Sequence, residues 1–241
     1  MRTILITGAS RGIGRACAEY FAKNGWRVVI NYNKSEEAAR VLAETINQNG
    51  GEAYIFKADV GNTDECRALV EYAASVGNGK LDALINNAAV DAIMPFDMMS
   101  TEDERRMFDV NLFGAMYCTR FALPYMISAK SGSIVNVSSI WGRVGASCEV
   151  QYSTTKAALI GFTKALSKEV APSGVRVNCV APGIIATDIN KSLTEEELDE
   201  FLSDVPMGRM GTPEEVANCV YFLCDSTYVT GQVLGVDGGY I

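Results

Sequence analysis

The sequence predicts a doubly wound α/β fold, in which helices cover both faces of a parallel sheet. Three observations support this prediction: short apolar runs rich in β-branched residues, helical-length segments between them, and the regular alternation of the two. Such apolar runs are typical of strands that are buried on both faces. The six runs are Thr3–Thr7, Arg27–Tyr32, Ala53–Asp59, Asp82–Asn87, Ser133–Ser139 and Val175–Pro182.

Helical-length segments connect most of these runs, and nothing in the sequence divides the chain. Clear examples of such segments are Gly12–Asn24, Ser35–Gln48 and Thr63–Ser75. A β-α-β order gives parallel strands joined by right-handed crossovers. The 241 residues are 48% hydrophobic and contain no repeat, low-complexity tract or linker. We therefore expect a single domain that spans residues 1–241.

Charge and composition exclude several classes of function. The net charge is −8 and the pI is near 4.7, so we expect neither a nucleic acid nor a membrane as a partner. The seven cysteines form no CxxC pair and the first apolar run is too short for a signal peptide, which predicts a reduced, cytoplasmic protein. Because the chain has no histidine, we expect no metal site.

A glycine-rich turn follows the first predicted strand. It reads TGASRGIG, and Gly8, Gly12 and Gly14 lead into the first helical segment. Such a turn brings bare backbone close to a ligand and directs the positive end of the helix at a pyrophosphate. An ordinary glycine turn is the alternative. The position after the first strand of a doubly wound domain favours a dinucleotide site.

The end of the second predicted strand indicates which dinucleotide binds. An acidic residue about 20 positions after the glycine turn would hold the ribose 2′-hydroxyl of NAD, whereas this chain has Asn33 and Lys34 there. Lys34 and Arg11, which lies in the turn, suit a 2′-phosphate through charge-assisted hydrogen bonds. The sequence thus favours NADPH/NADP+, the alternative being that both cations are solvated surface charges.

Because the chain lacks histidine, an enzyme of this sequence needs another group for proton transfer. Tyr152 and Lys156 are four residues apart at the start of a helical segment, so they project from one face. A nearby ammonium is expected to lower the phenol pKa, which would let the pair act as acid and base. Ser139, at the end of the fifth predicted strand, is placed to hydrogen-bond a substrate carbonyl. Taken singly, each residue also has an ordinary structural explanation.

Together these motifs resemble those of the short-chain dehydrogenase/reductase family over essentially the whole chain. The matching residues are TGASRGIG at 7–14, Asp59-Val60, NNAA at 86–89, Asn111, Ser139, YSTTK at 152–156, Pro182-Gly183 and Thr187. The resemblance implies a Rossmann fold with seven parallel strands in the order 3-2-1-4-5-6-7, the last at residues 231–239. It also implies a homotetramer, formed through the helix holding Tyr152 and through the C-terminal helix and strand.

The resemblance implies a role for individual residues in an NADPH-dependent reduction of a carbonyl. Tyr152 would protonate the carbonyl oxygen and Ser139 would orient it. Lys156 would lower the Tyr152 pKa and bind the nicotinamide ribose, and Asn111 would hold a water of a proton relay. The implied cofactor-binding residues are Gly8, Ser10, Arg11, Gly12, Ile13, Gly14, Asn33, Lys34, Asp59, Val60, Asn87, Ala88, Tyr152, Lys156, Pro182, Gly183, Ile185 and Thr187. Some members instead bind the dinucleotide as non-catalytic regulatory proteins, and these usually lack one or more of the four catalytic residues. Here all four, Asn111, Ser139, Tyr152 and Lys156, are present.

Two substrate classes stay open, and either a small molecule or a carrier-bound group is expected. The chain is most similar to 3-oxoacyl-[acyl-carrier-protein] reductases. In those enzymes two arginines near the active site dock the carrier protein. The corresponding residues here are Lys130, which is basic, and Ser173, which is not. The segment with Trp141 and Glu149 resembles that of reductases of the 5-aminopentanone modification on elongation factor P. A carboxylate beside an aromatic ring suits an amine-bearing ketone, although Glu149 could equally point to solvent or close a structural hydrogen bond.

The segment from Asp188 to Pro206 corresponds to the mobile substrate lid of the family. Its apolar residues are Leu193, Leu198, Phe201 and Leu202. They either cover an apolar substrate or pack a surface helix at amphipathic spacing. The sequence leaves both interpretations open.

Overall fold

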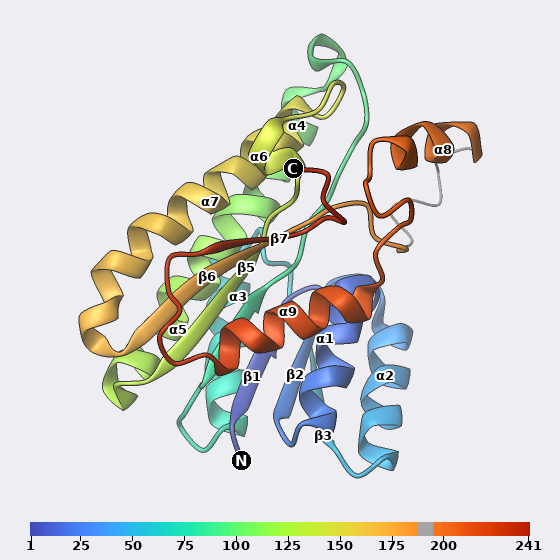
Figure 1. Cartoon of the computed structure of the whole chain (residues 1–241). Coiled ribbons are helices and arrows are strands. Elements are labelled where there is room, and N and C mark those ends of the chain that lie inside the picture. Colours follow the sequence, from blue (N-terminus) through green and yellow to red (C-terminus); the bar gives the residue numbers. More distant parts are fainter. Residues whose placement is uncertain (188–194) are drawn as a thin grey trace.

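Seven parallel strands form one twisted sheet in the computed structural model, which describes residues 1–187 and 195–241. The strand order is β3-β2-β1-β4-β5-β6-β7, and every neighbouring pair is parallel (Figure 1). The predicted sheet and its strand order are therefore confirmed. The strands are β1 Thr3–Ile6, β2 Arg27–Tyr32, β3 Glu52–Lys57, β4 Ala83–Asn86, β5 Gly132–Val137, β6 Val175–Pro182 and β7 Val233–Val236.

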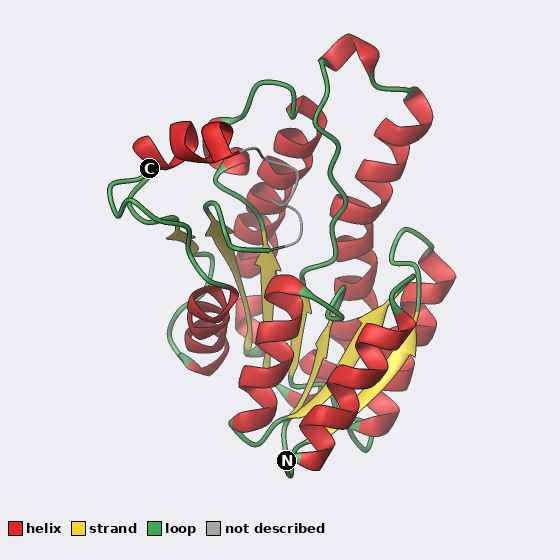
Figure 2. Cartoon of the chain, turned by 90° about the vertical axis from the view of Figure 1, so that its right-hand side faces the viewer, coloured by secondary structure: helices red, strands yellow, loops and turns green. Residues whose placement is uncertain are grey.

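Helices cover both faces of this sheet. Helices α1, α2 and α9 pack on one face and α3, α5 and α7 on the other (Figure 2). None of the described helices is long and apolar enough to cross a membrane. The helices are α1 Gly12–Lys23, α2 Glu36–Gln48, α3 Thr63–Val76, α4 Thr101–Phe108, α5 Gly114–Ala129, α6 Trp141–Val144, α7 Val150–Val170, α8 Glu195–Ser203 and α9 Pro213–Asp225, with short helical turns at Phe96–Met98, Asp109–Phe113 and Ala171–Ser173.

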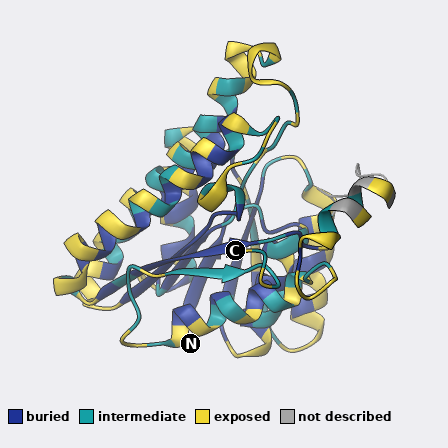
Figure 3. Cartoon of the chain, turned by 45° about the horizontal axis from the view of Figure 1, so that its top comes forward, coloured by how far each residue is buried: buried dark blue, intermediate teal, exposed yellow. Residues whose placement is uncertain are grey.

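Strand side chains alternate between two apolar cores. Ile4 and Ile6 of β1 belong to the core under α1 and α9, whereas Leu5 belongs to the core under α3 and α5. All three side chains are fully buried, and the strands are buried along much of their length (Figure 3). Because helices cover both faces, a strand has no polar side to present, which explains the continuous apolar runs in the sequence.

The element boundaries differ slightly from the predicted ones. The last strand spans only Val233–Val236, because Gly238 and Gly239 have φ values of +66° and +88°, in a region that strands do not use. The strand β5 ends at Val137. Ser139 therefore lies two residues beyond β5, still at the carboxyl edge of the sheet.

Candidate active site

A cavity of about 680 Å³ runs along the carboxyl edge of the sheet. Segments that follow β1, β2, β3, β4 and β6 line it, as expected for a ligand site in a doubly wound fold. All of the predicted cofactor-binding residues line this cavity except Gly14. Of the predicted catalytic and substrate residues, Tyr152 and Lys156 line it, and Asn111, Ser139, Trp141 and Glu149 do not.

The glycine turn after β1 packs against the turn after β4. Gly8 has a φ of +61°, and a Cβ there would lie 2.8 Å from the Cα of Ala88. A Cβ on Gly14 would lie 2.6 Å from the Gly8 carbonyl oxygen and from Asn87 Nδ2. Asn87 Nδ2 itself donates to the carbonyls of Thr7 and Gly8, at 3.0 and 3.1 Å. Bare backbone thus lines this end of the cavity, which fits the approach of a pyrophosphate.

The region beside β2 carries two exposed positive charges. Asn31 Oδ1 accepts from the Gly8 N–H at 3.1 Å, so β2 supports the glycine turn. Arg11 and Lys34 are exposed and line the cavity, and neither has an ion-pair partner in the described part of the chain. The carboxylate of Asp59 is neutralised by Arg106 at 2.9 Å. Two unpaired cations next to a neutralised carboxylate fit a 2′-phosphate.

Asp59 lies just after β3 and Arg106 lies in α4, so the sequence alone did not connect them. Asp59 follows β3, accepts from the N–H of Gly61 at 2.9 Å, and is also hydrogen-bonded to Asn33. Arg106 lies in α4 and lines the same cavity. No signal in the sequence pointed to Arg106, since basic residues in short exposed helices are common.

Ser139 and Tyr152 meet at the other end of the cavity. Ser139 follows β5 and Tyr152 lies in the first turn of α7, and their side chains are hydrogen-bonded. The Ser139 hydroxyl also accepts from the N–H of Trp141 at 3.1 Å, and only 8% of the residue is exposed. Two neighbouring hydroxyls can donate to one carbonyl oxygen, which is the arrangement that polarises a carbonyl.

Lys156 lies over the ring of Tyr152, one helical turn away, as the spacing predicts. Its Nζ is 5.4 Å from the centroid of the Tyr152 ring and donates to the Val137 carbonyl at 2.9 Å. The residue is 2% exposed, and this burial lowers the pKa of Lys156 to about 8. The ammonium form therefore predominates at neutral pH but loses its proton far more readily than an exposed lysine does.

The pKa of Tyr152 differs from the sequence-based expectation. Burial raises it well above the ordinary value, the charges of Asp91 and Glu149 raise it further, and only the hydrogen bond with Ser139 lowers it. The expected lowering of this pKa is not observed, because burial and the charges of Asp91 and Glu149 outweigh the Lys156 ammonium that lies over the ring. At neutral pH Tyr152 is consequently a protonated phenol, the form that donates a proton.

Asn111 lies behind the cavity wall, in the π-helical turn Asp109–Phe113. It is 1% exposed, its Oδ1 accepts from the Val90 N–H, and its Nδ2 donates to the Val90 carbonyl, both at 2.8 Å. A longer bond of 3.3 Å joins Nδ2 to the Thr155 hydroxyl. The side chain thus connects the loop after β4 to α7. The water-holding role implied by the resemblance stays a prediction.

Glu149 and Trp141, the predicted substrate residues, lie together with a third residue that the sequence analysis missed. Glu149 precedes α7, is half-buried, and is hydrogen-bonded to Trp141 and to Asp91. These contacts also fit the alternative in which Glu149 closes a structural hydrogen bond, so its role in substrate binding stays a prediction. Asp91 lines the cavity five residues after β4 ends at Asn86. A carboxylate soon after a buried strand, at the ligand-binding edge, is the signal that could have identified it.

The segment after β6 closes one side of the cavity. Gly183 packs against the C-terminal segment, since a Cβ there would lie 2.8 Å from the Cα of Asp237. Thr187 Oγ1 donates to the Ile185 carbonyl at 3.3 Å. Pro182, Gly183, Ile185 and Thr187 all line the cavity, as predicted for cofactor-binding residues.

Part of the predicted lid can be described. Residues 188–194, which include Asp188 and Leu193, lie outside the described residues. In α8, Phe201 packs edge-on against Trp141, with ring centroids 5.4 Å apart. Phe201 thus contacts Trp141, a predicted substrate residue, and both interpretations of the lid stay predictions.

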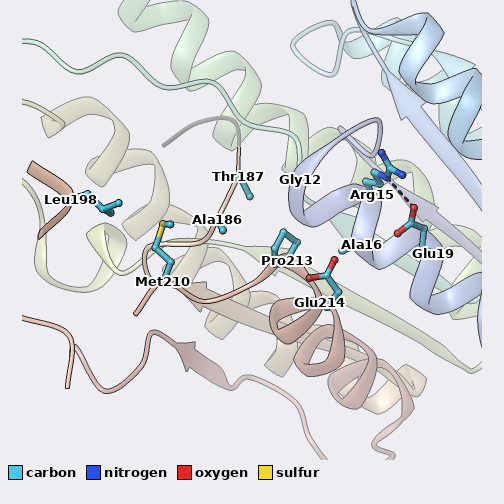
Figure 4. A pocket seen from close by; sticks show the side chains of 10 residues that line it. All are labelled: Gly12, Arg15, Ala16, Glu19, Ala186, Thr187, Leu198, Met210, Pro213 and Glu214. Carbon is cyan, nitrogen blue, oxygen red and sulfur yellow. Dashed lines mark hydrogen bonds and ion pairs between the residues drawn. The ribbon is translucent and has the colours of Figure 1, made fainter. Parts of the chain in front are cut away.

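A second cavity of about 460 Å³ lies beside the glycine turn, next to α1 and the start of α9 (Figure 4). It shares Gly12 and Thr187 with the larger cavity. Leu198 and Met210 supply apolar surface, and Arg15 is paired with Glu19 at 2.9 Å. None of the four predicted catalytic residues is among its ten labelled lining residues, so we assign the chemistry to the larger cavity.

Comparison with known proteins extends over the whole chain. A family model described as enoyl-(acyl carrier protein) reductase matches residues 8–241. The chain is 42% identical over 240 residues to the 3-oxoacyl-[acyl-carrier-protein] reductase of Synechocystis sp., covering 98% of this chain and 96% of that protein. It is 43% identical over 237 residues to the 3-oxoacyl-[acyl-carrier-protein] reductase FabG of Aquifex aeolicus, covering 98% of this chain and 95% of that protein.

A solved structure gives the same result. The crystal structure of a 3-oxoacyl-[acyl-carrier protein] reductase from Brucella melitensis matches with a TM-score of 0.93 and 36% identity, over 100% of this chain and 91% of that one. The resemblance found in the motifs is thus confirmed by full-length similarity in sequence and in fold. The chain belongs to the short-chain dehydrogenase/reductase family of oxidoreductases.

Proposed function

We propose that the protein reduces a carbonyl to an alcohol with NADPH. The observation that carries this proposal is the hydrogen-bonded pair of Ser139 and Tyr152 at one end of a cavity whose other end is bare glycine backbone. The glycine turn would hold the pyrophosphate, and Arg11 and Lys34 would hold the 2′-phosphate. Lys156 would bind the nicotinamide ribose, as the family resemblance implies.

The side chains at the substrate end have separate roles in the reduction. When bound, NADPH supplies the hydride that reduces the carbonyl carbon. The hydroxyls of Ser139 and Tyr152 hydrogen-bond the carbonyl oxygen and polarise it. Tyr152 carries its proton at neutral pH, so it gives that proton to the oxygen as negative charge develops there. The Lys156 ammonium, over the ring, stabilises the phenolate that remains.

The first candidate substrate is a 3-oxoacyl thioester, because the relatives at 42% and 43% identity are named 3-oxoacyl-[acyl-carrier-protein] reductases. Delivery on an acidic carrier protein is less well supported by this surface. The net charge is −8, and Ser173 is uncharged where a docking arginine is expected. Lys130, at the C-terminal end of α5, keeps one positive charge. Association with an acidic carrier would therefore gain little from electrostatic steering.

The second candidate substrate is an amine-bearing ketone, such as the 5-aminopentanone modification on a protein side chain. Glu149, Trp141 and Asp91 favour it, because two carboxyl groups and an indole ring lie together beside Tyr152.

We also propose that the protein is a homotetramer. Large apolar side chains are exposed on α5 and α7, including Ile127 and Val150, and on α9 and the segment after it, including Phe222 and Tyr228. Burial against a second copy would remove this surface from water. Sedimentation at micromolar concentration should give four times the chain mass of 26.0 kDa, and a monomer at that concentration would contradict the proposal.

The direct test is NADPH oxidation by the purified protein with an acetoacetyl thioester, a neutral ketone and an aminoketone. We expect one NADPH oxidised for each alcohol formed, and a rate with NADH at least about 10-fold lower, since two charged contacts to the 2′-phosphate are lost. NADPH binding with no oxidation by any carbonyl would instead identify a non-catalytic regulatory protein.

A further inference from the structure

Asp59 is a carboxylate next to the proposed 2′-phosphate site. It lies two residues beyond the end of β3, and Lys34 lies two residues beyond the end of the neighbouring strand β2. These strand ends are in register, since Tyr32 pairs with Lys57 and the Ala58 N–H donates to the Tyr32 carbonyl at 2.9 Å. Asp59 and Lys34 therefore follow adjacent strand ends, and both line the main cavity.

A bare carboxylate at this place would oppose the binding of NADPH. A phosphate monoester such as the 2′-phosphate carries a charge of about −1.5 to −2 at neutral pH, and like charges close together repel each other. An acid at the end of the second strand favours NAD, whose ribose has a hydroxyl at that position. In this chain an acid follows the third strand instead, so its charge has to be compensated for tight binding of NADPH.

Arg106 of α4 supplies the compensating charge. Its Nη2 lies 2.9 Å from each of the two carboxylate oxygens of Asp59. Burial by itself would raise the pKa of Asp59, but the hydrogen bonds from Arg106 and from the Gly61 N–H lower it below its usual value. Asp59 is therefore ionised and paired at neutral pH. Arg106 makes no other ion pair within residues 1–187 and 195–241.

Gly61 leaves room for this ion pair. A Cβ there would lie 2.5 Å from Nη1 of Arg106 and 3.3 Å from Oδ1 of Asp59. The backbone of Gly61 does not have the positive φ that favours glycine. Space for the guanidinium is thus the reason that the structure provides for a glycine at this position.

The balance of charge along this part of the cavity depends on Arg106. Apart from Asp91 and Lys156 at the substrate end, the charged residues that line the cavity are Arg11, Lys34, Asp59, Asp103 and Arg106. Asp103 lies in the first turn of α4, where its carboxylate accepts from the Ser100 hydroxyl at 2.7 Å. Without Arg106, the two remaining cations would be opposed by two acids.

We infer that Arg106 determines the preference for NADPH over NADH by neutralising Asp59. Arg11 and Lys34 attract the 2′-phosphate, and Arg106 removes the repulsion that the neighbouring carboxylate would exert on it. Arg106 thus acts through Asp59 and does not itself bind the phosphate. The inference rests on the proposed use of NADPH. It adds a specificity-determining residue from α4, outside the glycine turn and the end of β2.

The test measures the Kd of NADPH and of NADH at low ionic strength. In Arg106→Gln we expect the ratio of the NADH Kd to the NADPH Kd to fall about 10-fold, because the 2′-phosphate meets an unpaired carboxylate. Arg106→Lys, which keeps the positive charge, should hold this ratio within about 3-fold of the wild type. The matched control is Arg105→Gln, since Arg105 is the exposed neighbouring residue of α4 and does not line the cavity. The control should leave the ratio unchanged.

A double variant separates action through Asp59 from direct contact with the phosphate. Asp59→Asn/Arg106→Gln removes both charges, so the ratio should return to within about 3-fold of the wild type. Salt provides a second readout, because screening weakens the repulsion between exposed charges. The effect of Arg106→Gln on the ratio should therefore shrink between about 0.05 M and about 0.5 M salt. A purely structural contact would show no such dependence.

Two results would overturn the inference and leave the use of NADPH intact. An unchanged ratio in Arg106→Gln would show that Asp59 does not act on the 2′-phosphate. A double variant as impaired as Arg106→Gln would show that the guanidinium binds the phosphate directly. A wild type that binds NADH as tightly as NADPH would instead contradict the proposed cofactor, and the inference with it.

Discussion

The two ends of the cavity are built in different ways. At the cofactor end, main-chain atoms form the surface, because Gly8 and Gly14 let two turns approach and Asn87 ties them together. At the substrate end, side chains from separate segments form the surface, with Asp91 from the loop after β4 and Tyr152 and Lys156 from α7. Added atoms should therefore destabilise the closely packed cofactor end. Changes of charge or of proton affinity should instead alter catalysis at the substrate end.

The largest of these effects is expected for Lys156→Met at the substrate end. The buried ammonium is replaced by an apolar side chain of similar volume, which is often neutral or stabilising. We expect kcat to fall about 10³-fold, since the phenolate of Tyr152 loses its charge partner, while Tm is unchanged or higher. Steady-state kinetics and thermal unfolding measure both quantities. A large loss of stability would show that Lys156 mainly supports the fold.

The next largest effect is expected for Arg11→Ala at the cofactor end. Loss of one charge-assisted contact should raise the KM for NADPH about 10- to 100-fold and leave the KM for NADH nearly unchanged. Arg15→Ala is the matched control, because Arg15 lies four residues further along α1 and is paired with Glu19. Equal losses for the two cofactors in Arg11→Ala would contradict an NADPH preference based on the 2′-phosphate.

Gly8→Ala tests the close approach of the two turns. Gly8 and Gly79 both have positive φ, at +61° and +83°, but only Gly8 would place a Cβ against another main-chain segment. We expect Gly79→Ala to cost about 1 kcal/mol, from strain alone, and Gly8→Ala about 2–4 kcal/mol, because the collision adds to the strain. Denaturant unfolding of the two variants measures the difference. Equal costs would show that the contact with Ala88 relaxes freely.

The smallest effect is a change in how stability depends on pH in Glu149→Gln. The pKa of Glu149 is raised from 4.5 to about 8, so the folded protein binds the extra proton between these values. Its contribution to stability is full below the unfolded pKa and is lost as the pH rises through the folded pKa. Because Glu149 is half-buried, solvent screening reduces the effect, and we expect Glu149→Gln to gain about 1 kcal/mol, or about 2–4 °C in Tm, above about pH 8. The same gain at about pH 5 would contradict this account.

Much of the cofactor end could be predicted from the sequence, because its determinants are local. The spacing of Gly8, Gly12 and Gly14 after an apolar run is readable without tertiary structure, and so is the lack of a carboxylate at residues 31–35. The strands could be predicted for the same reason, since burial on both faces makes each one apolar throughout. The last strand was predicted too long, because positive φ values at Gly238 are not visible in a sequence pattern.

The substrate end could be predicted only in part. Tyr152 and Lys156 are recognisable because they lie one helical turn apart. Asp91 was missed because its partner, Glu149, is distant in the sequence and meets it only where the loop after β4 reaches the start of α7. The predicted direction of the Tyr152 pKa was wrong because burial and the charges of Asp91 and Glu149 outweigh the lysine one turn away.

The central claim, that Tyr152 is the proton donor of an NADPH-dependent carbonyl reductase, is tested most directly by Tyr152→Phe. The variant keeps the ring over which Lys156 lies and removes only the hydroxyl that meets Ser139. We predict an NADPH Kd within about 3-fold of wild type and a fall in kcat for carbonyl reduction of about 10³-fold or more. Turnover within about 10-fold of wild type, with NADPH bound normally, would contradict the account.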